Sequence, residues 1–388
     1  MKQSTALLKI AILTMSMVQL GTNGISPILA DIAAAFPTAS NTTIQFLMTF
    51  PSLFCMVFAL VSAFMAEKLP KKTLAVLGLT ITAAGGVLAV LFHSSLTILY
   101  LWAGIIGIGL GMVAPISLSL INETYTGAEM NTMLGWQNSS SNVGSMLMTF
   151  AGGFLAALGW NFGYLVYLLA IPGIIFTLLG VKNNKKACSQ TVKTSEHRQP
   201  FRLVIWREMI VVCLFLVVYS AVPVNMSMLI EQYQLGDASL SGVMSTLFLL
   251  AGTLMGLVFG WIVKIFGKFT NTLGVLLLAI GAFLMGLSSN LTVLIIGCLV
   301  AGVSMPIVMP SCMAAASRLK GYETINTALL MSSSYVGVFI TPLLSSVTTA
   351  ITGKTLTSNT FITIGIVSVI LVIVTLILKI QRPQKQEI

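Results

Sequence analysis

Ionisable side chains are scarce in this chain, which limits the chemistry that it can perform. Among 388 residues, 20 are Lys or Arg, 10 are Asp or Glu and two are His. Catalysis and metal binding need such groups clustered at one site. The two histidines and five cysteines show no paired spacing of that kind, and no nucleotide-binding loop is present. The sequence therefore predicts no catalytic residue, no metal and no cofactor.

One short charged stretch stands out at residues 63–72, which read Ala-Phe-Met-Ala-Glu-Lys-Leu-Pro-Lys-Lys between two apolar runs. A weaker copy follows about 197 residues later at 260–269, Gly-Trp-Ile-Val-Lys-Ile-Phe-Gly-Lys-Phe. The chemistry that such turns offer is ion pairing and contact with the charged ends of helix dipoles.

Uncharged polar residues inside the apolar runs are the second group of interest. Lipid cannot form hydrogen bonds, so these side chains must face another helix or a cavity. Two pairs, Gln19 with Asn23 and Asn138 with Asn142, are four residues apart and share one helical face. We treat eight residues as candidates for binding a small solute: Gln19, Asn23, Gln137, Asn138, Asn142, Tyr219, Asn225 and Tyr335. Hydrogen bonding between helices is the alternative role.

Composition decides which elements position these residues. The chain is 56% hydrophobic and 8% charged, with a mean hydropathy of +0.98, whereas soluble proteins carry about 25% charged residues. Apolar runs about 20 residues long favour membrane-spanning helices over strands. Twelve such runs are present, at 7–30, 43–65, 73–95, 97–121, 131–157, 161–181, 209–231, 240–263, 270–289, 291–316, 326–350 and 359–379.

The basic residues indicate the domain organisation. Residues 182–208 form a basic linker that divides an N-terminal six-helix bundle, 1–181, from a C-terminal one, 209–388. With both termini in the cytoplasm, every Lys and Arg except Lys354 lies on the cytoplasmic side, as the positive-inside rule requires. The net charge of +10 therefore reflects topology and does not indicate nucleic-acid binding. The segment from Pro115 to Gly144 has a counterpart from Pro310 to Gly337, which indicates an internal repeat.

The stretch 63–72 resembles the loop between helices 2 and 3 of the major facilitator superfamily. The family pattern is Gly, three residues, Asp, Arg or Lys, any residue, Gly, Arg, and Lys or Arg. Four charged positions match, Glu67, Lys68, Lys71 and Lys72, while Ala63 and Pro70 replace glycines. The resemblance implies an all-α integral membrane protein of twelve transmembrane helices in two pseudo-symmetric six-helix bundles, with the substrate between them.

The resemblance also implies a cytoplasmic gate. Glu67 is expected at the start of helix 11, and Lys71 is expected to meet Glu123 at the end of helix 4. In the second half Lys264 occupies the position of the motif's acid, which does not favour a contact with a helix N-terminus. The contact still expected there is a Lys268–Glu323 ion pair. A solvated loop that only enforces topology is the alternative.

Helix 5 resembles that of the superfamily's antiporters. Four of five glycines in their motif are present, Gly135, Gly144, Gly152 and Gly153, while Met148-Thr149 replaces the Gly-Pro pair. This resemblance implies export, with close helix packing as the alternative explanation. The arginine that proton-coupled exporters carry in helix 4 is Ala103 here. The candidates for proton coupling are therefore Asp31 and Glu231, which otherwise simply end a helix.

These observations predict a secondary active transporter for a small organic, amphiphilic or neutral solute, working by alternating access. Efflux of a drug or metabolite in exchange for protons is the first hypothesis, and an uptake carrier or uncoupled facilitator is the alternative. A membrane-embedded enzyme would need catalytic groups within the membrane. A receptor or scaffold would not need two pseudo-symmetric halves, which indicate motion between them. We expect a monomer in the lipid bilayer of a bacterial plasma (inner) membrane.

Overall fold

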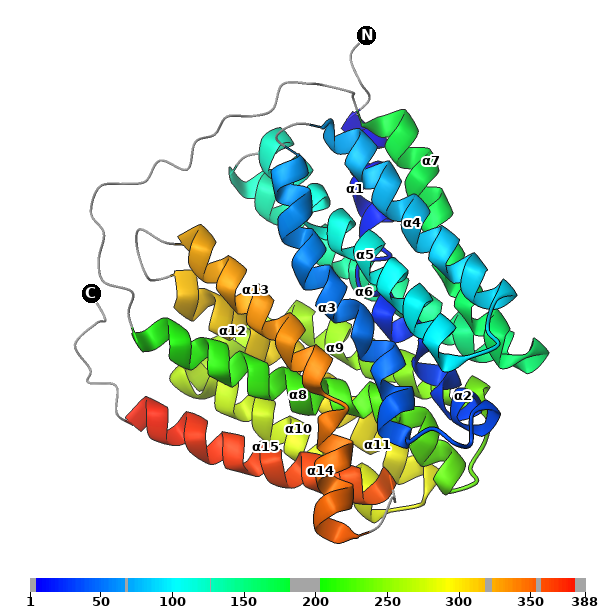
Figure 1. Ribbon diagram of the computed structural model, residues 1–388. Helices are drawn as coiled ribbons and strands as arrows, with labels where there is room; N and C mark the ends of the chain where they lie inside the picture. Colours follow the sequence, from blue (N-terminus) through cyan, green and yellow to red (C-terminus); the bar gives the residue numbers. More distant parts are fainter. Residues whose placement is uncertain are drawn as a thin grey trace. The chain divides into compact units, whose positions relative to one another are not determined.

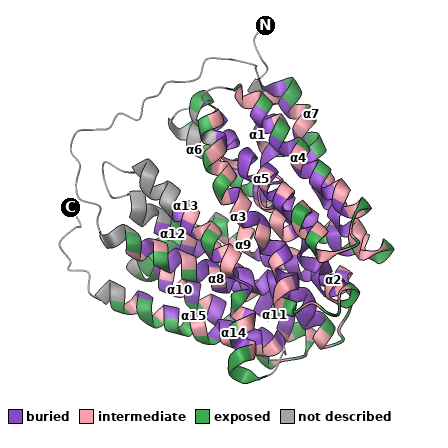
Figure 2. Cartoon of the chain, in the orientation of Figure 1, coloured by how far each residue is buried: buried purple, intermediate pink, exposed green. Residues whose placement is uncertain are grey.

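The computed structural model describes residues 5–66, 69–125, 127–181, 203–317, 323–353 and 357–380, and the regular secondary structure within these ranges is helical (Figure 1). Within these ranges ten helices are long and apolar enough to cross a membrane, and counting each of two bent helix pairs as one span gives 12. The fold is therefore the expected all-α membrane fold. Exposed residues recur along many of the helices (Figure 2).

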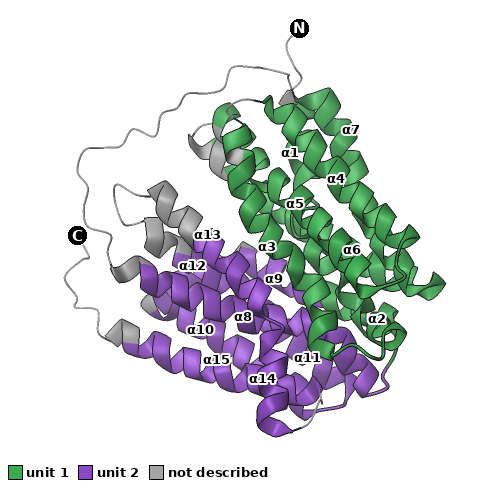
Figure 3. Ribbon diagram, in the orientation of Figure 1, with its two compact units in different colours: residues 1–192, 236–246 green, residues 193–235, 247–388 purple. Residues whose placement is uncertain are grey.

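The chain forms two compact units (Figure 3). Unit 1 comprises residues 1–192 and 236–246, and unit 2 comprises 193–235 and 247–388. Residues 182–202 of the expected linker lie outside the described residues. The remainder of that segment, 203–208, is not a loop, because helix α8 begins at Leu203.

Unit 1 contains the first seven α-helices and three 3-10 helices. Their bounds are α1 Thr5–Ser16, η1 Gly21–Ile28, α2 Leu29–Ala35, α3 Asn41–Met65, α4 Lys71–Leu91, α5 Leu96–Thr124, α6 Gly127–Leu155, η2 Ala156–Leu158, η3 Trp160–Leu169 and α7 Ala170–Gly180.

The other helices belong to unit 2, apart from the first turns of α9. Their bounds are α8 Leu203–Gln232, α9 Ala238–Phe266, η4 Gly267–Phe269, α10 Thr270–Leu287, α11 Leu291–Gly302, α12 Met305–Ser317, α13 Glu323–Ile340, α14 Leu343–Thr352 and α15 Thr357–Ile380.

Several spans begin with a side chain that caps the helix. Ser40 Oγ accepts a hydrogen bond from the Thr43 backbone N–H at the start of α3 (3.1 Å). Asp237 Oδ1 accepts one from Ser239 N–H at the start of α9 (3.0 Å). These contacts satisfy N–H groups that the first turn of a helix leaves unpaired, which fixes where the span begins.

Three spans that the sequence predicts as continuous helices, 7–30, 291–316 and 326–350, are interrupted, and the span 161–181 begins as the 3-10 helix η3. The first bends by 41° between α1 and η1, and the eleventh bends by 40° between α13 and α14. Pro342 explains the second bend, because proline has no N–H to donate. Gly21, Gly24 and Pro27 weaken the first span in a similar way.

The break in the first span packs against one side of α6. A Cβ on Gly144 would lie 1.9 Å from Met17 O, so only glycine allows this approach. Two serines beside Gly144 bond to carbonyls that flank the break: Ser140 Oγ donates to Leu13 O (2.7 Å) and Ser145 Oγ donates to Leu20 O (3.4 Å). Helix α6 thus supplies donors where the first span is irregular.

Of the four motif glycines, Gly135 does not pack as expected. It is exposed, and a Cβ there would meet nothing within 4 Å. Nine positions separate it from Gly144, which at about 3.6 residues per turn places the two on opposite sides of α6. Gly152 and Gly153 do pack closely, since added Cβ atoms would lie 2.6 Å from Gly24 O and 2.5 Å from Ala238 O.

We predict opposite effects for two alanine substitutions in α6. Gly144→Ala should lower the free energy of unfolding by about 1–3 kcal/mol, because the added methyl group collides with backbone. Gly135→Ala should leave it unchanged or raise it by up to about 1 kcal/mol, because alanine favours a helix. Thermal unfolding of the detergent-solubilised variants measures both. A Gly144→Ala protein as stable as the parent would show that α6 and the first span are not in close contact.

Candidate functional site

Four polar side chains form a hydrogen-bonded group within unit 1. Gln19 Nε2, from the break after α1, donates to Ser117 Oγ of α5 (2.6 Å), and Gln137 Nε2 of α6 donates to the same oxygen (2.7 Å). Ser141 Oγ donates to Gln19 Oε1 (3.3 Å) and to Gln137 O (3.0 Å). We call these four residues the glutamine–serine cluster. The structure thus joins the predicted residues Gln19 and Gln137 through Ser117, which sequence reasoning missed.

A similar contact joins the first and fifth spans in each unit. In unit 1, Asn23 Nδ2 donates to Ser145 Oγ (3.2 Å). In unit 2, Ser345 Oγ donates to Asn225 Oδ1 (3.3 Å), while Asn225 Nδ2 donates to Ala221 O (2.8 Å). Each contact lies beside a broken span, so both predicted asparagines also hold helices together.

The opposite side of α6 is polar and open. Asn138, Ser139 and Asn142 share this side with Gly135, and Asn138 and Ser139 are exposed. Asn138 bonds only to its own helix, through Leu134 O (3.1 Å). Ser139 and Asn142 form no hydrogen bond with another described residue. We call Asn138, Ser139 and Asn142 the open polar face.

The same side of α6 is covered further along by the first turns of α9. Thr246 Oγ1 donates to Met146 O (3.4 Å), and Ser239 Oγ donates to Gly153 O (3.3 Å). Gly242 makes the approach possible, because a Cβ there would lie 2.8 Å from Thr149 O. Among the described residues, the polar groups on this side that α9 leaves available to a ligand therefore lie before Met146.

The two predicted tyrosines differ in their surroundings. Tyr219 is 8% exposed and packs between Phe215 and Phe248, with ring centroids 5.6 and 4.9 Å away. Its ring therefore serves helix packing in unit 2. Tyr335 of α13 is half-buried.

The predicted contact between Lys71 and Glu123 is present. Lys71 Nζ, in the first turn of α4, donates to Glu123 Oε1 and to Ser119 Oγ, both on α5. Lys72 Nζ donates to Leu178 O in the last turn of α7 (2.6 Å). Both lysines thus tie α4 to neighbours in unit 1. Glu67 and Lys68 lie outside the described residues, as do the side chains of Lys268 and Glu323.

A second ion pair lies near the start of α6. Lys9 Nζ is 3.4 Å from Glu129 Oε1 and lies 5.6 and 6.0 Å from the ring centroids of Tyr125 and Trp136. Burial raises the pKa of Tyr125 above its usual value of 10, and the Glu129 carboxylate adds to the rise. Sequence reasoning missed this group because Lys9 and Glu129 are 120 residues apart.

The acids near the membrane surface are placed differently. Asp31 of α2 is half-buried, and Glu231 is exposed in the last turn of α8. Glu208, only 6% exposed, pairs with Arg207 (2.9 Å) in the second turn of α8. It was missed because the sequence placed residue 208 in the linker. Among the described residues, no group of three His, Cys, Asp or Glu could hold a metal ion.

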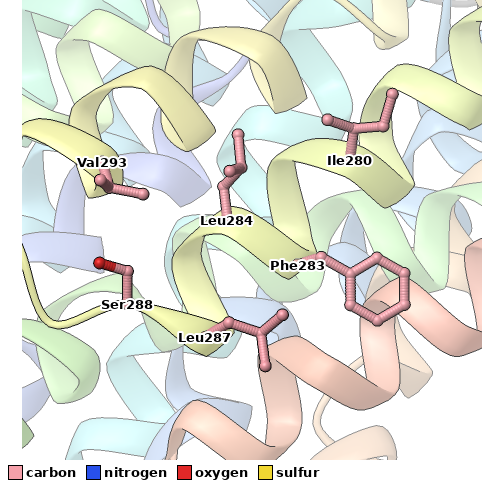
Figure 4. Close-up of a pocket in the computed structure, with 6 residues that line it drawn as sticks. All are labelled: Ile280, Phe283, Leu284, Leu287, Ser288 and Val293. Atoms are coloured by element: carbon pink, nitrogen blue, oxygen red, sulfur yellow. The ribbon is translucent and has the colours of Figure 1, made fainter.

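A hollow of about 270 Å³ lies within unit 2 (Figure 4). It is lined by Ile280, Phe283, Leu284, Leu287, Ser288 and Val293. One hydroxyl among five apolar side chains cannot orient a polar solute, so this hollow is not the candidate site.

The family comparison covers most of the chain. The model of the Major Facilitator Superfamily matches residues 11–327 and 209–388. The chain belongs to the major facilitator superfamily. It is therefore a multi-pass membrane transporter, in agreement with the resemblance seen in residues 63–72. The search of curated proteins gave no match.

Solved structures of other transporters share the fold of this superfamily member. A POT family transporter in complex with a thioalcohol-conjugated peptide is 14% identical, with a TM-score of 0.77 over 97% of each chain. A mutant of the nucleoside transporter NupG is 13% identical, with a TM-score of 0.77 over 96% of this chain and 99% of that chain. A bacterial homolog of the human lysosomal transporter Spinster is 13% identical, with a TM-score of 0.74 over 97% and 95%. At such identities the likeness shows the fold alone.

We predict a measurable coupling between Lys71 and Glu123. A double-mutant cycle with Lys71→Ala and Glu123→Ala should give a coupling free energy of up to about 1 kcal/mol, because the two side chains are only 18% and 37% exposed. The Lys9–Glu129 pair is the control: it is longer and more exposed, at 31% and 59%, and should couple less. Thermal unfolding at low and high salt measures both cycles. Equal coupling energies for the two pairs, or no coupling energy between Lys71 and Glu123, would contradict a stabilising Lys71–Glu123 ion pair.

Proposed function

We propose that this transporter moves a small organic, amphiphilic or neutral solute by alternating access, and that it exports the solute in exchange for protons. The observation that carries the proposal is the open polar face of α6. Two carboxamides and a hydroxyl without partners in neighbouring helices are costly in lipid. They are accounted for if this face lines a water-filled path for the solute.

The absence of charge away from the ends of the described spans supports a neutral solute. Lys9, Asp31, Arg207, Glu208 and Glu231 all stand near the ends of their spans. Phosphates or dicarboxylates are usually held by a buried arginine. A site of carboxamides, hydroxyls and apolar side chains suits an uncharged, partly apolar molecule.

Gating follows from the charged loop. We infer that the Lys71–Glu123 ion pair holds the start of α4 against α5, and we propose Glu67 as the gate residue that the resemblance pairs with the start of helix 11. Lys72 contributes by holding α4 to α7 through Leu178 O. In the second unit the Lys268–Glu323 pair is proposed in the same role.

Export is favoured by the packing of α6. Gly144, Gly152 and Gly153 of the antiporter motif each meet the backbone of another segment. This segment-to-segment contact is what the motif glycines permit. The structural neighbours include peptide and nucleoside transporters, which shows how varied the solutes of this fold are.

A facilitator without ion coupling is the second candidate. It is favoured by one observation, the lack of ionisable residues away from the ends of the described spans, because such residues mark ion pathways. Asp31 is the first candidate for proton coupling and Glu231 the second.

Transport assays decide between these candidates. In proteoliposomes with an imposed pH gradient and a panel of labelled neutral solutes, the parent should accumulate a solute against its concentration gradient. Asp31→Asn should abolish accumulation but keep downhill exchange, because the residue would no longer carry a proton. Glu231→Gln, at the corresponding position, tests the second candidate in the same way. Accumulation by Asp31→Asn equal to the parent would remove Asp31 from proton coupling, and downhill movement alone in the parent would favour the facilitator.

A further inference from the structure

The hollow in unit 2 lies along the exposed side of α10 (Figure 4). Four residues of that helix, Ile280, Phe283, Leu284 and Leu287, recur at the spacing of one helical face, and Val293 of α11 stands beside them. At 1.5 Å per residue, the distance from Ile280 to Leu287 is about 10 Å. The hollow is therefore an open groove about two helical turns long, which suits an elongated apolar group.

Close packing on both sides fixes the walls of the hollow. A Cβ on Gly365 of α15 would lie 2.8 Å from the ring of Phe283, so the ring lies directly against α15. A Cβ on Gly297 of α11 would lie 3.1 Å from Leu284 Cβ, so α11 closely approaches α10 as well. The side chains that line the hollow are thus held by helix packing within unit 2, as in a preformed site.

The surface around the hollow is apolar. Helix α10 carries no polar side chain from Leu273 to Leu287, and Ile280 and Leu287 are exposed. Ile296 of α11 and Ile370 of α15, on the neighbouring helices, are exposed too. An exposed face of a membrane span that offers water no polar partner meets the hydrocarbon of the bilayer. The hollow is therefore continuous with the lipid-facing surface of unit 2.

Polar groups gather at one end of the hollow, where the turn 288–290 joins α10 to α11. Asn290 N–H donates to Ser288 Oγ (3.1 Å), and Asn290 Oδ1 accepts from Thr292 N–H (2.9 Å) to cap α11. Neither the Ser288 hydroxyl proton nor the Asn290 NH2 group is donated to a described residue. This end of the hollow thus offers hydrogen-bond donors. No charged residue or histidine occurs from residue 270 to 317.

We propose that the hollow is a phospholipid site, which holds one acyl chain along α10 and the ester and phosphate oxygens of the same lipid at the turn 288–290. The turn joins two spans, so it stands at the level of the membrane interface, where these oxygens lie. They are acceptors, which the donors of Ser288 and Asn290 complement. Because residues 270–317 carry no charge, the site takes a zwitterionic lipid such as phosphatidylethanolamine. The inference does not depend on which solute is transported.

Photo-cross-linking tests the site. The purified full-length protein is placed in phosphatidylcholine nanodiscs that contain a phosphatidylethanolamine with a diazirine in one acyl chain, and mass spectrometry identifies the cross-linked residues. Cross-links should be at least about threefold more frequent at residues 280–287 of α10 than at residues 366–377 of α15, which also carry exposed apolar side chains. The reason is that the walls of the hollow add van der Waals contacts that an open helix face lacks.

Two tryptophan substitutions on α11 separate the hollow from the general lipid surface. Val293→Trp places a large ring in the hollow, so cross-linking of α10 should fall to the level of α15. Ile296→Trp is the matched control, because it adds the same ring at an exposed position of the same helix that does not line the hollow. This variant should keep the parent pattern. Thermal unfolding shows whether both variants are folded.

Competition tests the polar end of the hollow. Unlabelled phosphatidylethanolamine should suppress cross-linking of α10 at a lower concentration than hexadecane, which has a chain but no acceptor. In Ser288→Ala this advantage should shrink by up to about threefold, because one donor is lost. Ser289→Ala is the control, since Ser289 is in the same turn but does not line the hollow.

Each part of the proposal can fail on its own. Equal cross-linking of α10 and α15 in the parent, or an unchanged pattern in a folded Val293→Trp protein, would show ordinary lipid contact only and overturn the site. Hexadecane competing as well as the phospholipid, or an unchanged advantage in Ser288→Ala, would overturn the role of the turn. Displacement of the lipid probe by a solute that the proteoliposome assay shows to be carried would make the hollow a solute site instead. Cross-linking requires no transport, so none of the lipid results bears on the proposed function.

Discussion

The structure depends on one constraint: inside a lipid bilayer, every polar group needs a partner supplied by the protein or by enclosed water. Helix α6 shows both solutions on its two sides. The side that faces α5 and the first span carries Gln137, Ser140 and Ser141, whose hydrogen bonds reach α5 and the broken first span. The opposite side carries the open polar face, Asn138, Ser139 and Asn142, whose side chains have no partner on another helix among the described residues. Paired groups hold unit 1 together, and unpaired ones need water, which a transporter must admit along the path of its solute.

The same constraint explains why irregular backbone is tolerated here. A broken helix exposes backbone groups, and these are acceptable only where neighbours approach closely enough to bond to them. Gly144 permits that approach at Met17 O. In unit 2 Gly337 permits a similar one, because a Cβ added there would lie 2.5 Å from Cys213 O. In each unit an asparagine of the first span meets a serine of the fifth. The internal repeat seen in the sequence therefore extends to the contacts that stabilise each unit.

Much of the fold was predictable, because span length and hydropathy are local properties of the sequence. The superfamily was also predictable from four charged positions in 63–72, and the Lys71–Glu123 contact followed from it. Three features were not. Breaks in the spans depend on which neighbour can satisfy the freed backbone groups. The spacing of nine residues places Gly135 and Gly144 on opposite sides of α6, but matching residues to a motif does not show which side of the helix each one occupies. Ser117 is one of many serines in apolar runs, and only the three-dimensional structure shows that two glutamines converge on it.

A scan of water accessibility along α6 tests this account most directly. Single cysteines at residues 137–145, in a cysteine-free protein in lipid nanodiscs, are labelled with a water-soluble maleimide. The account predicts rapid labelling at residues 138, 139 and 142 and slow labelling at 137, 140 and 141, with helical periodicity between them. Rapid labelling at 137, 140 and 141, or protection at 138, 139 and 142, would contradict the claim that unpaired polar groups on α6 mark the solute path.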